Sequence, residues 1–436
     1  MNAVVIAVLI MIVLSLLRLN VVLALFIGAL AGGLVAGMGY GEVIGVFTEG
    51  ITGGAEIALS YALLGGFAAL IAYSGITEVL VTFIIRTLKK EQSKKARIIA
   101  KVSIIAALLA ISIMSQNLIP IHIAFIPILI PPLLSLMNEL GFDRRLIAVV
   151  LTFGLTFPYV LFPIGFGQIF QNTIVSGFES AGTDIAFGQV APALVLPASG
   201  FVVGLILALV YYRKQRIYET KTFGSANETE ASMKTIAIAL VAIAATFGVQ
   251  ILTDSMIFGA LAGIMVFFLS FQFKWSRLDN ELVDGIRVMA YIGIVMLAAN
   301  GFAAVISETG HVGPLVDGIA ETLSGQKVLI VGSMLLVGLI VTMGIGSSFA
   351  TIPIIASIFI PMGMELELSI PAIIAIIGTA GALGDAGSPA SDSTLGPTAG
   401  LSADGQHDHI WDTCVPTFIF LNIPVLIAGF LAGLIL

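Results

Sequence analysis

Charged residues are scarce in this chain of 436 residues: only 10% are Asp, Glu, Lys or Arg, whereas an ordinary soluble domain has about 25%. This shortage excludes a water-soluble globular enzyme, a nucleic-acid-binding protein and a disordered regulator. Cys414 is the single cysteine, which excludes an internal disulfide and a cysteine-rich metal site. No positive charge precedes the first apolar segment, residues 2–17, whereas a cleaved signal peptide would need one there. We therefore expect a retained first helix.

Hydrophobic residues are abundant instead, at 58% of the chain, with a mean hydropathy of +1.10. A helix that crosses a bilayer needs roughly 20 apolar residues, so the chain could supply about ten crossings. Two apolar runs, 98–137 and 328–364, are too long for one straight helix and leave almost no turn if each makes two. The sequence predicts an all-α polytopic membrane protein.

The positive charges predict the orientation. They cluster at 86–101, 144–145, 213–234 and 274–287, and with Arg18 these clusters account for 18 of the 19 basic residues. Because Lys and Arg concentrate on the cytoplasmic side, both flanks of run 98–137 lie inside, and we interpret this run as a re-entrant hairpin. By alternation, run 328–364 is a second hairpin that enters from outside. If each run instead made two complete crossings, its flanking charges would lie on the same sides as in a hairpin. The charges therefore leave this alternative open. The prediction is a multi-pass protein of the cell inner membrane, with ten transmembrane helices, two hairpins and both termini outside.

The two halves of the sequence resemble each other. Residues 49–75 align without gaps on 284–310 with ten identities in 27 positions. We expect a first repeat at 1–212, a cytoplasmic linker at 213–234 and a second repeat at 235–436. Each half would hold five crossings, an odd number, so the second repeat is inverted. Inverted repeats with broken helices near the midplane are typical of secondary transporters.

Small polar residues occupy the predicted hairpin tips. Their hydroxyl and amide oxygens suit a hard cation such as sodium or the polar groups of a solute. The alternative is simple capping of the tips. The tip residues in question are Ser115, Gln116, Asn117, Gly346, Ser347 and Ser348.

The strongest local signal is the stretch 384–394, where two carboxylates, several hydroxyls and a proline interrupt an apolar run. Asp385 lies about 15 residues into that run, roughly 22 Å at helical rise, and a carboxylate at such depth is a functional candidate by default. The first-half counterpart, residues 156–159 followed by Pro163 and Gly165, has a break but no charge, and Asn300 lies in another crossing. From this group we predict a substrate or ion site made of Thr156, Pro158, Asn300, Asp385, Ser388, Ser391, Asp392 and Thr394. The sodium candidates are Asn117, Ser348, Asp385 and Asp392.

The segment 404–412 contains a His-x-His spacing that can hold zinc, but no HExxH motif or cysteine pair accompanies it. We expect it to cap the last helix and to hold a cytoplasmic loop against the rest of the molecule.

The stretches GDAGSPASDSTLGPTAG at 384–400 and DGQHDHIWDTCVPTF at 404–418 resemble the C-terminal signature of the NhaC-type ion transporters, within the wider ion transporter superfamily. The resemblance is closest to the branch predicted to import histidine. It implies two inverted repeats with two hairpins, an elevator-type mechanism and a homodimer. It also implies that cation and substrate bind at the hairpin tips and at the unwound helices after them. Antiporter relatives have an SDTT-like run and a later basic stretch, whereas this chain reads SDST and has no arginine in HDHIWD.

Together these features predict an ion-coupled secondary transporter of an amino acid, with histidine as the cargo that the resemblance implies. Sodium or a proton would be the coupling ion, the lipid bilayer would surround the protein, and no other cofactor and no nucleic-acid partner are expected. A sodium/proton antiporter is the alternative. A channel fits an asymmetric acid pair less well, and an intramembrane aspartyl protease would draw its two acids from two elements. We therefore expect no enzymatic activity.

Overall fold

The computed structural model describes residues 2–75, 94–117, 125–219, 232–253, 255–311, 314 and 327–436. Helices are the only regular secondary structure in these ranges. Eight described helical segments are long and apolar enough to cross a bilayer, and six shorter apolar ones accompany them. The prediction of an all-helical membrane protein is confirmed, while the number of ten crossings depends partly on residues outside the described ranges.

The first half of the chain is described from α1 to α9. Three helices come first, then two in the run predicted as a hairpin, then a helix that stops and restarts, and then a final helix. These are α1 (Ala3–Leu16), α2 (Val21–Val35), α3 (Tyr40–Tyr73), α5 (Lys94–Asn117), α6 (Phe125–Leu140), α7 (Arg144–Leu161), α8 (Phe166–Ser180), the short η2 (Phe187–Gln189) and α9 (Val190–Tyr211).

The second half follows the same order. Its last segment is a continuous helical stretch that contains two π-helical turns, η3 and η4. The elements are α10 (Met233–Thr253), α11 (Met256–Leu269), α12 (Trp275–Glu308), α14 (Lys327–Ile345), α15 (Ser348–Glu365), α16 (Ile370–Gly387), α17 (Asp392–Leu401), η3 (His409–Cys414), α18 (Val415–Thr417), η4 (Phe418–Asn422) and α19 (Ile423–Ile435). The division at 213–234 into two inverted repeats stays a prediction.

Capping side chains explain where several helices begin. Asn2, Asn20 and Asp143 each accept a hydrogen bond from a backbone N–H in the first turn of the helix that follows. Ser369 and Ser391 do the same for α16 and α17. These side chains satisfy N–H groups that have no partner within the helix.

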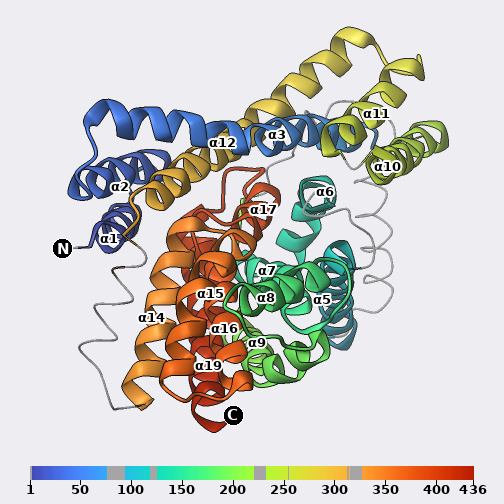
Figure 1. Ribbon diagram of the computed structural model, residues 1–436. Helices are drawn as coiled ribbons and strands as arrows, with labels where there is room; N and C mark the ends of the chain where they lie inside the picture. The colour runs from blue at the N-terminus through green and yellow to red at the C-terminus, as the bar shows by residue number, and fades with distance from the viewer. Residues whose placement is uncertain are drawn as a thin grey trace.

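The long helices α3 and α12 pack along each other and cross the top of the view in Figure 1. They contain all but the last two residues of each aligned segment, 49–75 and 284–310. A Cβ atom on Gly65 would lie 2.6 Å from the Gly285 carbonyl oxygen, and one on Gly50 would lie 2.9 Å from that of Asn300. Only glycine permits this approach. The alignment matches Gly50 with Gly285 and Gly65 with Asn300. The same pair of repeat positions therefore makes a close contact twice, once with each helix supplying the first member.

The helices α2 and α11 pack against this pair, next to α1 and α10 respectively. Beneath the pair, α14, α15, α16 and α19 form a bundle with α5, α7, α8 and α9 (Figure 1). The helix α16 is its centre, in contact with α7, α9, α14, α15 and α19, and every residue from Ala372 to Gly387 is buried. Isoleucine, alanine and glycine dominate this stretch. A charge within it, such as that of Asp385, must find its partners inside the protein.

Apolar side chains also cover much of the outer surface. Several on α2, α9, α10 and α19 are more than half exposed, among them Leu23, Val203, Ile206, Leu240 and Ile427. So much exposed apolar area is unfavourable in water and is the surface that a bilayer requires.

Candidate functional site

The helices α16 and α17 are separated by residues 388–391, which form the interruption that the sequence predicts. Pro389 has no backbone N–H to continue a helix. The Ser388 hydroxyl donates to the carbonyl oxygen of Met343 (2.7 Å) and accepts from the backbone N–H of Ala390 (3.0 Å). The broken segment is thereby attached to the end of α14.

Asp385 lies one turn before this break and is only 7% exposed. The Tyr159 hydroxyl, from α7, donates to its Oδ2 atom at 2.5 Å, and the Ser348 hydroxyl donates to the same atom. The Ser391 hydroxyl donates to Oδ1 at 3.3 Å. Three hydroxyls from three separate segments therefore hold one buried carboxylate.

Ser348 is the first residue of α15 and the centre of this hydroxyl network. Its Oγ atom lies 2.9 Å from the Tyr159 hydroxyl and 3.0 Å from the Gly381 carbonyl oxygen, in addition to its bond with Asp385. A serine hydroxyl has one proton and two lone pairs, and it rotates to suit its neighbours. The network can therefore present hydrogens to a charged carboxylate or oxygen lone pairs to a cation.

The tip of the α14–α15 hairpin packs directly against the break. Gly346 has φ +72°, and a Cβ atom there would lie 2.7 Å from the carbonyl oxygen of Ala390. Ser347 is half-buried, and its carbonyl accepts the Thr351 hydroxyl at 2.7 Å. The predicted tip residues Gly346, Ser347 and Ser348 thus lie at the interruption that holds Asp385.

Asp392 begins α17 and is half-buried. Its carboxylate accepts no hydrogen bond within the described ranges, although it interacts electrostatically with Asp385 and with Tyr61 of α3. The Thr394 hydroxyl bonds the carbonyl oxygens of Ser388 (2.5 Å) and Ser391 (2.9 Å). Thr394 therefore shapes the break, while Asp392 lies between it and α3.

In the first half, the interruption comes later than the sequence predicts. The helix α7 continues to Leu161, and the interruption is residues 162–165. The Phe162 N–H still bonds the Pro158 carbonyl oxygen (2.8 Å), and the chain turns at Gly165, where φ is +58°. The Thr156 hydroxyl donates to the Thr152 carbonyl of the same helix (2.7 Å). Thr156 and Pro158 thus belong to α7 itself, and among the described contacts neither reaches Asp385.

Tyr159 is not among the predicted site residues, yet its hydroxyl donates to Asp385 at 2.5 Å. The signal for it was a tyrosine within an apolar helix, because a buried phenol hydroxyl usually needs a partner. Asn300 lies in α12, where its backbone carbonyl faces Gly50. The side chains of the remaining predicted tip residues, Ser115, Gln116 and Asn117, lie outside the described part of the structure.

A second buried charge lies where the loop 402–408 meets α7. Arg144 is fully buried, and its two terminal nitrogens donate to Asp404 at 2.6 and 2.5 Å. It also donates to the Leu401 carbonyl and to Asn138, both at 3.0 Å. Burial opposes ionisation of Asp404, but the hydrogen bonds and charge of Arg144 outweigh it and hold the pKa of that carboxyl below its ordinary value.

The His-x-His segment connects this loop to the break. The His409 Nε2 atom lies 2.9 Å from the Pro389 carbonyl oxygen, and because a carbonyl only accepts, Nε2 must donate. The Nδ1 atom lies 2.8 Å from the Thr398 hydroxyl, and His407 lies 2.7 Å from that of Thr413. The described residues contain no group of three or more His, Cys, Asp or Glu side chains that could hold a metal ion. The histidines hold the loop in place.

Comparison with models of protein families identifies the family of this chain. The model of the Na+/H+ antiporter family matches residues 150–431, more than half of the chain. The chain belongs to the Na+/H+ antiporter family. A second model, of the Na+-H+ antiporter family, matches residues 2–88 of this antiporter-family chain. The two family matches and the apolar helices of the chain together identify it as a multi-pass membrane protein.

Full-length relatives of this antiporter-family chain occur in several bacteria. It is 52% identical over 442 residues to the "Putative amino acid transporter YuiF" of Bacillus subtilis, with all of both chains covered. It is 50% identical to an uncharacterised membrane protein of Vibrio parahaemolyticus over all of both chains. A membrane protein of Haemophilus influenzae is 46% identical over all of this chain and 99% of that one.

Two solved transporter structures align more distantly. The Alcanivorax borkumensis YdaH transporter aligns with a TM-score of 0.40 and 15% identity, over 88% of this antiporter-family chain and 86% of that one. The Neisseria gonorrhoeae MtrF pump aligns with the same score and identity, over 90% and 83%. At this level the likeness supports no further argument.

Proposed function

We propose that this protein is an ion-coupled secondary active transporter of an amino acid. The observation that carries the proposal is the cluster around Asp385. A carboxylate in the buried part of α16 meets hydroxyls of a second helix, of a hairpin tip and of its own interrupted segment. Such a group is costly to insert and is expected to have a function.

Asp385 is the proposed coupling-ion site, with Ser348 and Ser391 as neutral oxygen ligands. A sodium ion would be held by the ionised carboxylate once the hydroxyls rotate their protons away. A proton would instead neutralise Asp385 directly. Both would relieve the buried negative charge. Asp392, half-buried beside α3, is proposed as a second acid that binds the same ion or the cargo.

The proposal includes two inverted repeats, an elevator-type motion and a homodimer. The shared order of helices in the two halves supports the repeats, as do the reciprocal glycine contacts between α3 and α12. The pair α3 and α12 would serve as the fixed part, and the bundle around α16 as the part that moves. Coupling requires only that ion and cargo stabilise the same state, so that each raises the affinity for the other.

The cargo class rests on the relative named as an amino acid transporter and on the resemblance of the 384–418 region to a branch predicted to import histidine. We propose histidine as the first cargo to test. We also propose that the protein lies in the inner membrane of the cell.

The test is uptake of labelled L-histidine into proteoliposomes under an imposed sodium or pH gradient. We expect accumulation with one of the two gradients and none without a gradient. Asp385→Asn should abolish accumulation while the purified protein stays monodisperse with an unchanged melting temperature. Wild-type uptake by Asp385→Asn would remove this residue from the coupling site.

A sodium/proton antiporter is the second candidate, because both family models carry that description. Its expected result is a pH change inside the vesicles when sodium is added, without any amino acid. The same vesicles distinguish the two functions, since a transporter coupled to its cargo moves no ions in the absence of cargo.

A further inference from the structure

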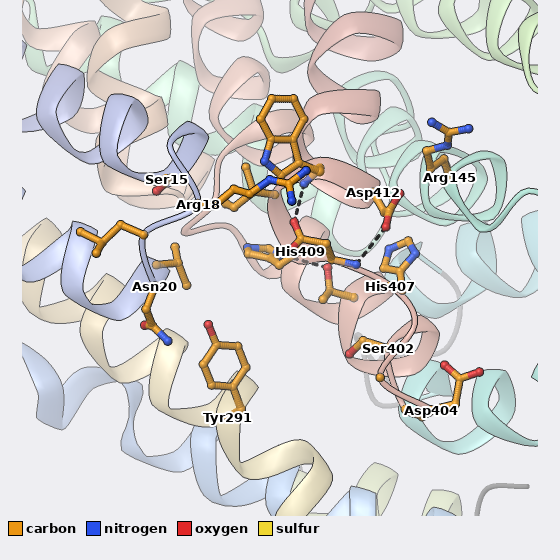
Figure 2. Close-up of a pocket in the computed structure, with 18 of the residues that line it drawn as sticks. Ser15, Arg18, Asn20, Arg145, Tyr291, Ser402, Asp404, His407, His409 and Asp412 are labelled. Carbon is orange, nitrogen blue, oxygen red and sulfur yellow. Dashed lines mark hydrogen bonds between the residues drawn. The ribbon is translucent and has the colours of Figure 1, made fainter. Parts of the chain in front are cut away.

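A cavity lies apart from Asp385, between the α1–α2 turn, α12 and the 402–412 segment (Figure 2). Its volume is about 870 Å³, within the range of about 300–1,000 Å³ usual for small-molecule sites. Three arginines and three aspartates line it, so its formal charge balances. This balance favours a ligand that carries both charges over an anion or a cation.

Ion pairs account for four of these six groups. Arg145 pairs with Asp143, Arg216 with Asp412, and Asp404 with the buried Arg144. In the described part of the chain, Arg18 and Asp408 belong to no ion pair. Among the described residues, the cavity therefore offers one positive and one negative charge without an ion-pair partner.

Arg18 and Asp408 both contact Trp411. The Arg18 guanidinium carbon lies 6.0 Å from the centre of the Trp411 ring, and an Asp408 carboxylate oxygen accepts the Trp411 backbone N–H at 2.7 Å. Figure 2 shows Arg18 beside an indole ring at the edge of the cavity. Arg18 has φ +65° because it forms the left-handed turn that ends α1, where the Leu19 N–H bonds the Leu14 carbonyl oxygen at 3.0 Å.

A further polar group of the wall lacks a partner. His407 is 6% exposed and lines the cavity, and its Nδ1 atom has no hydrogen-bond partner among the described residues. A buried polar atom without a partner is rare in folded proteins. It is a group that a bound polar molecule or a water would satisfy.

We propose that this cavity binds a zwitterionic α-amino acid, with its carboxylate at Arg18 and its ammonium at Asp408. The proposal rests on the transport function proposed above, and it separates the amino-acid site from the ion site at Asp385. Trp411, Tyr291 and the imidazoles of the wall would then contact the side chain of the ligand.

The cavity is connected to the break that carries Asp385. His409 lines the cavity and bonds the Pro389 carbonyl oxygen of the break. A smaller apolar pocket of about 260 Å³ shares Ser15 and Ile410 with the cavity and extends to Gly387 and Pro389. An amino acid in the cavity would therefore touch the residues that position the interrupted helix, which provides a route for coupling.

The experiment measures equilibrium binding to the purified full-length protein. The twenty proteinogenic L-amino acids are first screened by thermal shift, and the best binder is titrated calorimetrically. We expect Arg18→Gln and Asp408→Asn each to weaken its Kd at least ten-fold. Arg287→Gln is the matched control, because Arg287 forms an exposed pair with Asp284 on α12 outside the cavity lining. It should leave the Kd unchanged.

Ligand analogues assign the two ends. The methyl ester of the best binder has no carboxylate, so its already weak binding should not change further in Arg18→Gln. The N-acetyl derivative has no ammonium and should be insensitive to Asp408→Asn. If Arg18→Gln does not fold, Arg18→Lys, which keeps the charge, and the analogue titrations of the wild type test the same contacts.

The outcomes separate this inference from the proposed function. If an amino acid binds and is transported but both variants keep the wild-type Kd, the cavity is not its site and the transport function stands. Loss of affinity in Arg18→Gln alone would mean an anion site and would overturn the zwitterion assignment. If none of the twenty amino acids binds the wild type, the amino-acid transport function fails as well.

Discussion

Asp385 and Arg144 are both charged residues in a largely apolar helix bundle, and their partners differ. Arg144 has a carboxylate of opposite charge in bidentate geometry, whereas the described side chains that hydrogen-bond Asp385 are neutral hydroxyls. A neutralised pair is suited to a permanent structural role. An acid surrounded by rotatable hydroxyls keeps the capacity to bind and release a cation.

Tyr159→Phe tests the hydroxyl that sequence reasoning missed. A hydrogen bond to a charged group contributes about 1.5–3 kcal/mol. This one stabilises the ion-free carboxylate, so its loss should lower the KM for the coupling ion by about ten-fold or more. The measurement is the initial rate of uptake against ion concentration in proteoliposomes. Tyr211→Phe is the control, since Tyr211 is exposed at the end of α9 and its ring contacts Tyr212 and Phe420 rather than the site. An equal effect of both variants would contradict a specific role for Tyr159.

Asp404→Asn tests the buried pair and its pH dependence. Breaking such a pair costs about 3–5 kcal/mol, so the melting temperature at pH 7 should fall by several degrees or more. The folded-state pKa of Asp404 is lowered, so its contribution is complete above the unfolded value of about 3.9 and is lost as pH falls through the folded value. The difference from wild type should therefore shrink below about pH 4.

The control for this series is Arg287→Gln, which breaks a pair whose side chains are 74% and 67% exposed. Exposed pairs contribute about 0–1 kcal/mol, so its melting temperature should stay near that of the wild type. A difference between Asp404→Asn and wild type that stays constant down to pH 3 would show that the carboxylate charge is not what stabilises the loop.

Among the elements, the contact between the α14–α15 tip and the α16–α17 interruption is the one that assembles the site. It depends on Gly346, which combines a left-handed backbone with a close approach to a carbonyl oxygen. Because of both properties, a residue with a side chain at position 346 would displace the tip. Since Ser348 follows two residues later, any movement of the tip changes its distance to Asp385.

Gly346→Ala should therefore lower the transport rate at least ten-fold. The left-handed conformation costs an alanine about 1–2 kcal/mol, and the contact with the Ala390 carbonyl displaces the tip. Gly37→Ala separates the two effects, because Gly37 has φ +89° with open space around its Cβ position. It should lower the melting temperature and leave the rate unchanged. Equal loss of transport in both variants would mean that strain alone is responsible.

The elements were largely predictable from the sequence because their signals are local. Proline, glycine and short polar runs mark the interruption at 388–391 and the tip at 346–347, and hydrophobicity defines the helices between them. The first-half interruption was placed too early, since Pro158 is tolerated inside α7 and the chain turns only at Gly165.

The site itself was predictable only in part. Ser348, Asp385 and Ser391 carry short polar side chains next to breaks, and the structure brings them together. Tyr159 reaches Asp385 across 226 residues of sequence, and no local pattern reveals such a partner. The sequence could not single out Arg18 and Asp408 either, because the ion pairs of the other charged residues of the cavity are known only from the structure.

The whole molecule is predicted to have its basic loops in the cytoplasm and both termini outside. In a Cys414→Ser background, Ile217→Cys and Ile435→Cys offer exposed positions in the linker and at the end of α19. We expect a membrane-impermeant maleimide to label Ile435→Cys in intact cells and Ile217→Cys only in inside-out vesicles. Labelling of both from one side would contradict the predicted topology.

The pair between Arg144 and Asp404 joins residues 260 positions apart. During synthesis, at about 5–20 residues per second, the arginine must wait on the order of tens of seconds before its counter-charge leaves the ribosome. Until then α7 cannot settle into its final place without burying an uncompensated charge. The N-terminal half therefore has to remain loosely assembled in the membrane until its last helices arrive, and a chain truncated before Asp404 should be a substrate for membrane quality-control proteases.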